Sequence, residues 1–194
     1  TQSIVILPHF MSWTIVSMLS VAILSANGVV NQLITMVGGK TIEFYNTPSV
    51  WPAILVILKV WQGAGFGSIV YLATITGIDA SIYEAAAVDG ASKTQCIFKV
   101  TLPMLKNTII MLTIMSVGKI FNGDFGMIYA MVGSNSILYP TTDVIDTYLF
   151  RQLLENPSMG QTAAVGLIQS ILGFGFVVLC NKVANKWSPE SALF

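Results

Sequence analysis

The sequence predicts an all-α protein, a polytopic membrane helix bundle with about four spans in its 194 residues. Hydrophobic residues make up 54% of the chain and charged residues only 9%, whereas soluble domains carry about 25% charged residues. The apolar residues are gathered in runs near the roughly 20 residues that a helix needs to cross a bilayer. A short charged segment, residues 79–103, separates two of these runs and is expected to lie outside the lipid.

Four apolar runs are long enough to be membrane spans. The predicted spans run from about Val5 to Leu24, Val50 to Thr76, Met104 to Phe121, and Thr162 to Cys180. Glycines and a proline in residues 27–48 are expected to break the first span, and Asn122-Gly123-Asp124 the third. Before the fourth span, Thr142 or Asp143 is expected to cap an amphipathic helix that Asn156-Pro157 ends.

Residues 79–103 predict a compact helical projection. Ser81 and Glu84 have the spacing of a capping box, which predicts a helix beginning just after Ser81. Gly90 is expected to end this helix, because glycine readily takes the left-handed conformation. Two short helices joined by a glycine would present a surface to a partner.

The second short helix of this projection is expected to begin at Ser92, which has the right side chain for an N-cap. Pro103 is expected to close it, because a proline disfavours helical geometry in the residue before it. The apolar sequence of the third span resumes at Met104.

The same segment matches the signature of a known family. Its residues Glu84, Ala85, Ala86, Gly90, Val100, Leu102 and Pro103 resemble the cytoplasmic EAA loop of permease subunits in bacterial ATP-binding-cassette carbohydrate importers. The one departure is Val100, where isoleucine is usual. The flanking WQGAGFGSIVYLATITGID and the distal YPTTDVIDTYLFRQLLEN and SPESALF resemble the branch that handles complex oligosaccharides.

This resemblance implies the MetI-like type I importer permease fold, a multi-pass protein of the bacterial cytoplasmic (inner) membrane. Residues 1–194 are expected to form a single permease domain, with a cytoplasmic coupling loop at 79–103. Because the chain begins at Thr1 and family members carry further helices before this point, it looks N-terminally truncated. The residues expected to couple the chain to the ATPase are Glu84, Ala85, Ala86, Asp89, Gly90, Leu102 and Pro103.

The resemblance also implies partners. ATP is expected to be hydrolysed by a separate ATP-binding-cassette ATPase dimer, beside a second, usually different, permease subunit and an extracytoplasmic solute-binding protein. The chain has no G-x-x-x-x-G-K-[ST] sequence, so it is not expected to be an enzyme or to bind a cofactor. Its net charge of zero offers no basic surface for nucleic acid. Cys96 and Cys180 are expected to be packing thiols, with no metal site.

Lysine positions predict the orientation. If residues 79–103 are cytoplasmic, most of the lysines lie on the same side, as the positive-inside rule requires. The expected cytoplasmic lysines are Lys93, Lys99, Lys106, Lys182 and Lys186. Only Lys40 and Arg151 then lie in outer loops.

Two lysines fall inside apolar sequence. Lys59 and Lys119 would face a water-filled substrate path, where they would attract an anionic sugar such as a uronate. The alternative is that they snorkel to the outer interface or pair with Asp124 or another acid. Trp61 and Gln62, beside Lys59, offer aromatic stacking and an amide to a sugar. The candidate path residues are Lys59, Trp61, Gln62, Ser116, Lys119, Asn122 and Gln169.

Small and polar residues recur at helical spacing in three spans. The stripes are Ser116-Lys119-Asn122, then Gly166-Gln169-Ser170-Gly173, and His9-Ser12-Trp13-Ser17-Ser20. Each stripe is expected either to line the path or to pack against another helix. For the glycines at 63, 65 and 67, close helix packing is the better interpretation.

Two other classes of function stand beside the importer permease. An ion-coupled secondary transporter would need intramembrane acids, and the predicted spans contain none that can be placed. A membrane enzyme or assembly scaffold is the other class. The sequence shows neither the nucleophile and base pair nor the metal cluster that would support it.

Overall fold

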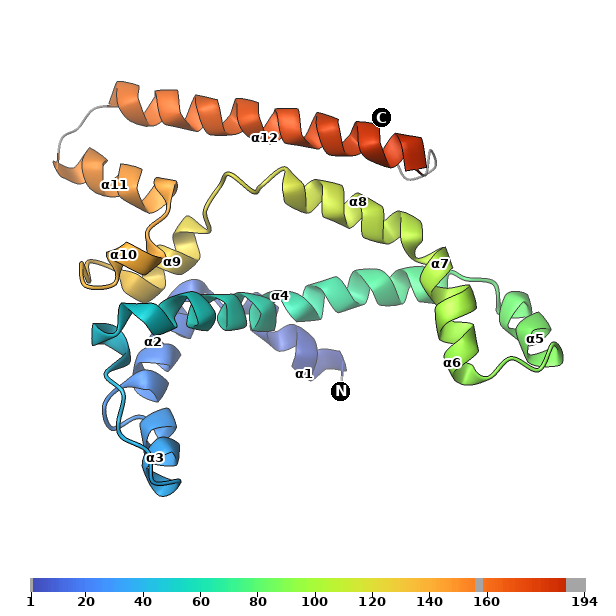
Figure 1. Cartoon of the computed structure of the whole chain (residues 1–194), viewed down its shortest axis with the longest axis horizontal. Coiled ribbons are helices and arrows are strands. Elements are labelled where there is room, and N and C mark those ends of the chain that lie inside the picture. The colour runs from blue at the N-terminus through green and yellow to red at the C-terminus, as the bar shows by residue number, and fades with distance from the viewer. Residues whose placement is uncertain (1, 156–158, 188–194) are drawn as a thin grey trace. The chain divides into compact units, whose positions relative to one another are not determined.

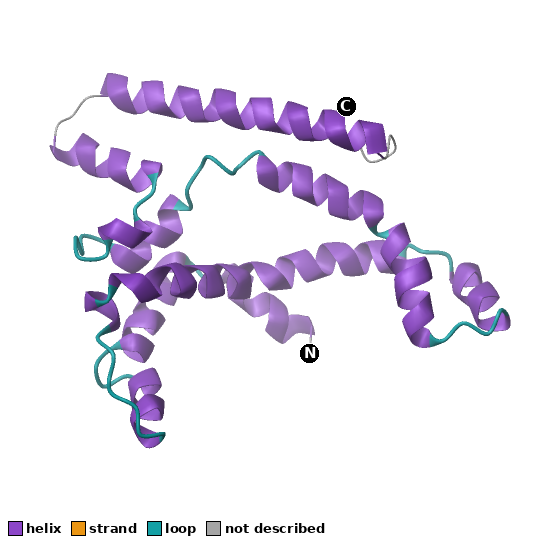
Figure 2. Ribbon diagram, viewed as in Figure 1, coloured by secondary structure: helices purple, strands orange, loops and turns teal. Residues whose placement is uncertain are grey.

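The computed structural model describes residues 2–155 and 159–187, and every element in these ranges is helical (Figure 2). This confirms the all-α prediction. The chain divides into two compact units, Thr1–Gly65 with Asn122–Ala163 and Phe66–Phe121 with Ala164–Phe194. The boundary between them falls inside two long helices, α4 (Trp51–Thr76) and α12 (Met159–Trp187).

The first unit is built from short helices around the beginning of α4 (Figure 1). Its other elements are α1 (Gln2–Ile6), η1 (Leu7–Phe10), α2 (Trp13–Leu24), α3 (Val29–Met36), η2 (Phe44–Asn46), η3 (Pro48–Val50), α9 (Phe125–Val132), α10 (Tyr139–Thr142) and α11 (Ile145–Glu155). Helices α9 and α10 were not predicted from the sequence. The amphipathic helix before the last span was predicted, and α11 confirms it. The predicted end of that helix, at 156–157, lies outside the described residues.

Trp51, at the start of α4, is the centre of the first unit's core. It is fully buried, and its indole N–H donates to the Phe44 carbonyl at 2.7 Å. The other buried members of this core are Val16, Leu55, Met127, Ile128, Met131, Val132 and Leu138. Helix α2 is further joined to α9 by the Ser17 hydroxyl, which donates to the Ala130 carbonyl at 2.6 Å. The predicted small-polar stripe of the first span therefore serves helix packing at this position.

Asn31 closes the loop that follows α2. Its side chain is 1% exposed, and its amide donates to the carbonyls of Ser25 and Ile42 at 3.0 and 2.9 Å. Its carbonyl oxygen accepts the Ile42 N–H at 2.8 Å. One buried side chain thus ties α3 to both flanking segments by three hydrogen bonds.

The second unit contains the rest of α4 and α12 together with the predicted projection. Its other elements are α5 (Ala80–Val88), α6 (Lys93–Cys96), the π-helical segment η4 (Ile97–Thr101), α7 (Leu102–Met104) and α8 (Lys106–Val117). Helices α8 and α12 approach closely through small residues, since a Cβ atom on Gly173 would lie 2.8 Å from the Gly118 carbonyl oxygen. The hydroxyls of Thr74 and Thr108 lie 3.2 Å apart and join α4 to α8.

Within the described residues, three segments are long and apolar enough to cross a membrane: Trp13–Met36, Pro48–Thr76 and Met159–Lys186. A fourth is possible if Lys93–Met104 and Lys106–Val117, which are bent by 54° at their junction, form one broken span. The second and fourth predicted spans correspond to Pro48–Thr76 and Met159–Lys186. Their predicted ends differ from the observed ends by a few residues, except at Thr76, where the two coincide.

The predicted first span was wrong at its start, whereas its predicted end at Leu24 is the last residue of α2. Its helix begins at Trp13 because Ser12, in extended conformation, caps α2 by accepting the Ile15 N–H at 3.3 Å. The apolar residues before Ser12 belong to α1 and η1 instead. The loop predicted at 27–48 contains α3, so the apolar segment continues to Met36.

The predicted third span, Met104 to Phe121, overlaps α8 but extends beyond its end. Helix α8 ends at Val117, and the backbone turns at Gly118, so Lys119 and Asn122 do not continue the helical face of Ser116. Pro103 does not close a helix, because it sits in the first turn of α7, where no N–H is required. Just before it, the Leu102 N–H donates five residues back to the Ile97 carbonyl in a π-helical turn.

We predict that Asn31→Ala destabilises the protein by about 1–3 kcal/mol, because it leaves a buried N–H and two carbonyls without their partner. Thermal unfolding of the purified protein in detergent measures the loss as a lower Tm. Gln32→Ala is the matched control, since that exposed side chain makes a single hydrogen bond to the Asn27 carbonyl. Equal losses in the two variants would contradict the role given to Asn31.

Candidate functional site

The first helix of the projection, α5, is capped by Asp79. The Asp79 carboxylate accepts the Ser81 N–H at 2.9 Å, and the helix begins at Ala80. The predicted capping box of Ser81 and Glu84 was therefore wrong, because Asp79, two residues before Ser81, is the N-cap. The Ser81 N–H is also the main cause that holds the pKa of the Asp79 carboxyl below its usual value.

Gly90 ends α5 as predicted. Its φ is +74°, its N–H donates to the Ala87 carbonyl at 3.0 Å, and the Ala91 N–H donates to the Ala86 carbonyl at 2.9 Å. This pair of hydrogen bonds is the Schellman motif, which needs a residue in the left-handed conformation. A β-branched side chain at Gly90 would be strained there even though the space around it is open.

The second helix, α6, is capped by Ser92 as predicted. The Ser92 hydroxyl accepts the Gln95 N–H at 3.3 Å, and the Gln95 side chain accepts the Ser92 N–H at 2.8 Å. Gln95 was missed by the sequence analysis, although its spacing from Ser92 is that of a capping box. The structure therefore places the reciprocal cap on the second helix of the loop and not on the first.

Helices α5 and η4 are held together by one side-chain contact, with the hydroxyls of Tyr83 and Thr101 3.0 Å apart. The outward surface of the two segments is apolar and acidic: Val88 is 88% exposed and Phe98 is 64% exposed. Glu84, Ala85 and Asp89 are exposed on the same helix, whereas Ala86 is half-buried. Such a surface is suited to a protein partner, because covering exposed large apolar side chains lowers the free energy.

In the first unit, Lys59 is paired with Asp124. Its ammonium lies 2.5 Å from an Asp124 carboxylate oxygen and 5.6 Å from the centre of the Trp13 ring. Pairing with Asp124 was one of the alternatives that the sequence left open. The neighbouring Gln62 donates its amide to the Met11 carbonyl at 3.0 Å, and Trp61 is 44% exposed.

In the second unit, the candidate path residues do not share one face. Ser116 donates to the Leu112 carbonyl of its own helix, and Lys119 lies exposed in the turn after α8. Gln169 is 7% exposed and donates to the Phe121 carbonyl at 2.8 Å, so it serves the packing of α12. Asn122, on the other side of the unit boundary, is exposed.

The predicted packing role of the α4 glycines holds for one of the three glycines and not for the other two. A Cβ atom on Gly65 would lie 2.2 Å from the Val5 carbonyl oxygen, which confirms close packing there. Gly63 and Gly67 have open space where a Cβ atom would stand, so the packing interpretation was wrong for these two.

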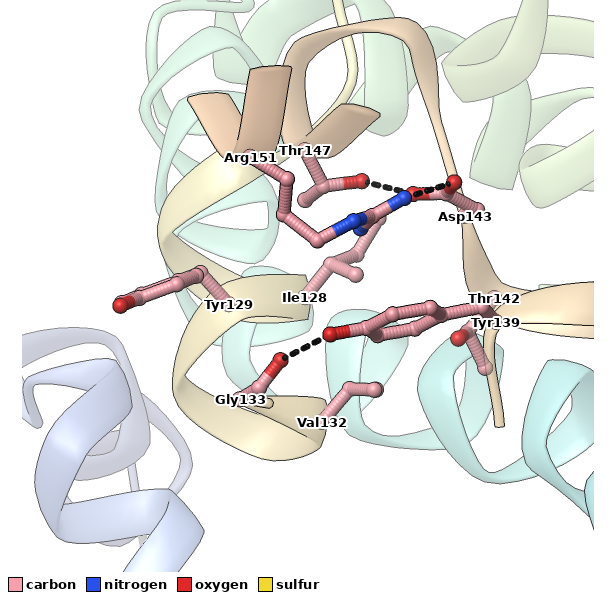
Figure 3. A pocket seen from close by; sticks show the side chains of 9 residues that line it. All are labelled: Ile128, Tyr129, Val132, Gly133, Tyr139, Thr142, Asp143, Thr147 and Arg151. Carbon is pink, nitrogen blue, oxygen red and sulfur yellow. Dashed lines mark hydrogen bonds and ion pairs between the residues drawn. The ribbon is translucent and has the colours of Figure 1, made fainter. Parts of the chain in front are cut away.

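A clamp of polar residues in the first unit was missed by the sequence analysis. The Arg151 guanidinium donates to both oxygens of Asp143, at 3.0 and 2.5 Å, and lies 3.9 Å from the centre of the Tyr139 ring (Figure 3). The Thr147 hydroxyl donates to the same carboxylate at 2.6 Å. The cavity beside them has a volume of about 10 Å³, room for a single water, so it is too small for a sugar.

The contacts within this clamp shift the pKa values of both of its ionisable groups. Hydrogen bonds from Arg151 lower the pKa of Asp143, with Thr147 adding to the effect, and Asp143 raises the pKa of Arg151. Because the pKa of Asp143 is lower in the folded protein, the clamp is fully stabilising above the usual aspartate pKa. Its contribution is lost as the pH falls through the lowered value.

Among the residues that the structure describes, no three histidine, cysteine, aspartate or glutamate side chains gather as metal ligands would. Cys96 and Cys180 are both free and half-buried.

Comparison with known proteins gives consistent matches. The family model of "binding-protein-dependent transport system inner membrane component" matches residues 2–187. The polygalacturonan/rhamnogalacturonan transport system permease protein YteP of Bacillus subtilis (strain 168) is 33% identical over 190 residues, covering 97% of this chain and 59% of YteP. Protein LplB of the same organism is 32% identical, with the same coverage. The chain thus spans less than two thirds of these curated relatives.

A solved structure also matches closely. The crystal structure of a bacterial alginate ABC transporter in complex with alginate pentasaccharide-bound periplasmic protein contains a chain with 35% sequence identity and a TM-score of 0.89. The match covers 96% of this chain and 65% of that one.

We predict that Asp79→Ala increases hydrogen exchange at the first amides of α5, because it removes the acceptor of the Ser81 N–H. Ser81→Ala is the matched control and keeps wild-type exchange, since its hydroxyl is not the cap. Asp79→Asn keeps the acceptor and is expected to behave like wild type. Exchange measured by mass spectrometry in detergent at neutral pH, where the Asp79 carboxyl is charged, tests all three; faster exchange in Ser81→Ala alone would contradict the assignment.

Proposed function

Because the chain belongs to the family of binding-protein-dependent transport system inner membrane components, we propose that it is the permease subunit of an ATP-driven importer that moves oligosaccharides into the cytoplasm. The observation that carries this proposal is the exposed two-helix loop at 79–103, with the EAA signature on its first helix. Family membership favours this function over an ion-coupled secondary transporter.

The loop at 79–103 is proposed to couple this chain to an ATPase. Exposed Glu84 would meet an ATPase arginine or backbone N–H, and the surface from Ala85 to Gly90 would lie in the ATPase cleft. The exposed Val88 supports this, because it is 88% accessible at the tip of the helix. Leu102 and Pro103 would keep the second helix in place at the end of the π-helical segment.

The whole importer requires partners that this chain does not supply. We propose an ATP-binding-cassette ATPase dimer that hydrolyses ATP, a second permease subunit of different sequence, and an extracytoplasmic solute-binding protein. The structural relative supports the last of these, since it was crystallised in complex with a periplasmic protein that carries an alginate pentasaccharide.

An acidic oligosaccharide is the proposed substrate. The relatives support this, because one is named for polygalacturonan and rhamnogalacturonan and another for the acidic polysaccharide alginate. In the first unit, the half-exposed Lys59 and Trp61 support a path through this part of α4. Of the predicted path residues, the proposal keeps Lys59, Trp61 and Gln62, because all three lie on α4 within the first unit.

The coupling role predicts that Glu84→Lys and Gly90→Val each abolish ATP-dependent uptake. Glu84→Lys reverses a contact charge, and Gly90→Val forbids the left-handed helix stop. Uptake and ATPase stimulation are measured in vesicles that contain the full-length permease with its ATPase, second permease and solute-binding protein. Both variants are expected in the membrane at normal levels, and Gly67→Ala, at an open position of α4, is the control. Normal uptake in both coupling variants would overturn the assignment of the loop.

The orientation predicts which residues a membrane-impermeant thiol reagent reaches in intact cells. Cys96, in the proposed cytoplasmic loop, is expected to stay unlabelled, whereas a cysteine replacing the exposed Ser134 is expected to react. Permeabilised cells are the control, since both sites then become accessible. Labelling of Cys96 and protection of position 134 in intact cells would reverse the topology.

A further inference from the structure

Lys59 carries a charge inside a segment that crosses the membrane. It lies in the candidate span Pro48–Thr76, and its side chain remains 55% exposed although it is paired with Asp124, which is 29% exposed. Exposed charge is strongly disfavoured in hydrocarbon, so the open side of this pair faces water or another protein. The half-exposed pair is also a weak one, because solvent screens its attraction.

Asp124 is held in place by more than its pairing with Lys59. One of its oxygens accepts the Met127 N–H at 3.1 Å and caps α9, while the other oxygen accepts from Lys59. Removal of Lys59 from the pair would therefore leave Asp124 positioned by its role as a cap. An ammonium group has three donors, so Lys59 also has donors beyond the one given to Asp124.

An aromatic ring stands beside this ammonium. The Lys59 nitrogen lies 5.6 Å from the centre of the half-buried Trp13 ring, within the range of a cation–π contact. A cation that binds carboxylate and an indole that packs against an apolar sugar face are the two groups that a carboxylated sugar requires. Both belong to the first unit, on α4 and α2.

We propose that Lys59, Asp124 and Trp13 form a subsite that selects carboxylated sugars, with Asp124 as a counter-ion that the substrate displaces. The sugar carboxylate takes the place of Asp124 on the Lys59 ammonium, and the sugar ring packs against Trp13. Asp124 remains hydrogen-bonded to the Met127 N–H. A neutral sugar cannot make this exchange, so the subsite discriminates by charge. This inference rests on the proposed function and adds Trp13 and Asp124 to the path.

The test compares a charged and a neutral ligand with the same sugar backbone, an oligogalacturonate and its methyl ester, in vesicles containing the complete importer. The measured quantity is the ratio of their ATP-dependent uptake rates at concentrations below saturation. Because the same solute-binding protein delivers both ligands to every variant, a change in this ratio between variants arises in the permease. If the wild-type importer takes up neither ligand, the proposed function fails before the subsite is tested.

Asp124→Asn is the decisive variant. Asparagine caps a helix as well as aspartate does, so α9 is kept while Lys59 loses its counter-ion. The acid-to-ester ratio is expected to rise about threefold to tenfold. Lys59→Gln is expected to lower the ratio about tenfold, and the double variant to resemble Lys59→Gln. Lys40→Gln removes an exposed lysine elsewhere and is the charge-matched control.

Trp13→Leu separates stacking from charge. It keeps an apolar side chain on α2 but removes the ring, so uptake of both ligands is expected to fall together with little change in their ratio. The proposal is overturned if Asp124→Asn and Lys59→Gln both reduce assembly of the complex, the double variant restores it, and the ratio stays unchanged throughout. That pattern would make the ion pair a structural contact, either within this chain or against a second subunit.

Discussion

Hydrocarbon offers no hydrogen bonds, and this constraint explains how the polar residues of the apolar helices are used. Ser17 donates to the Ala130 carbonyl, Gln169 donates to the Phe121 carbonyl, and the hydroxyls of Thr74 and Thr108 meet. Each contact joins two segments that are distant in sequence. The few polar groups of the spans therefore act as points of attachment between helices, in places where apolar packing alone is weakly directional.

The same constraint makes the loop at 79–103 stand out. There the polar groups are satisfied locally, by Asp79, Gly90 and the reciprocal pair of Ser92 and Gln95. A segment that closes its own hydrogen bonds does not depend on neighbouring helices for its shape. It is free to present its apolar and acidic side chains outward, as Val88 and the carboxylates beside it do.

Local signals were the part of the fold that the sequence predicted well. Gly90 and Ser92 were placed correctly because their conformations depend on a few adjacent residues. Ser81 was mistaken for the cap because two competent residues stand two positions apart, and only the backbone geometry decides between them. The end of α8 was missed because apolar residues continue beyond Val117 into the turn, so hydropathy carries no sign of the stop.

Long-range contacts were beyond what the sequence alone decides. The pairing of Lys59 with Asp124 joins residues 65 positions apart. The sequence alone was compatible both with this ion pair and with a lysine that faces a water-filled path. The clamp forms because α11 brings Arg151 to Asp143, eight residues before it, whereas the sequence suggested Asp143 only as a possible helix cap and gave no sign of this pairing. Residue type allows such contacts, but the packing of the elements decides which of them form.

The π-helical segment Ile97–Thr101 has a consequence for the length of the loop. A π-helical turn accommodates one residue more than an α-helical turn, so the residues on either side are rotated by about 100° from the register of a continuous α-helix. A deletion of one residue here would restore the α-helical pattern and carry Phe98 and its neighbours to a different face. The number of residues between Gly90 and Pro103 therefore sets the direction in which the loop presents its apolar surface, independently of which residues occupy it.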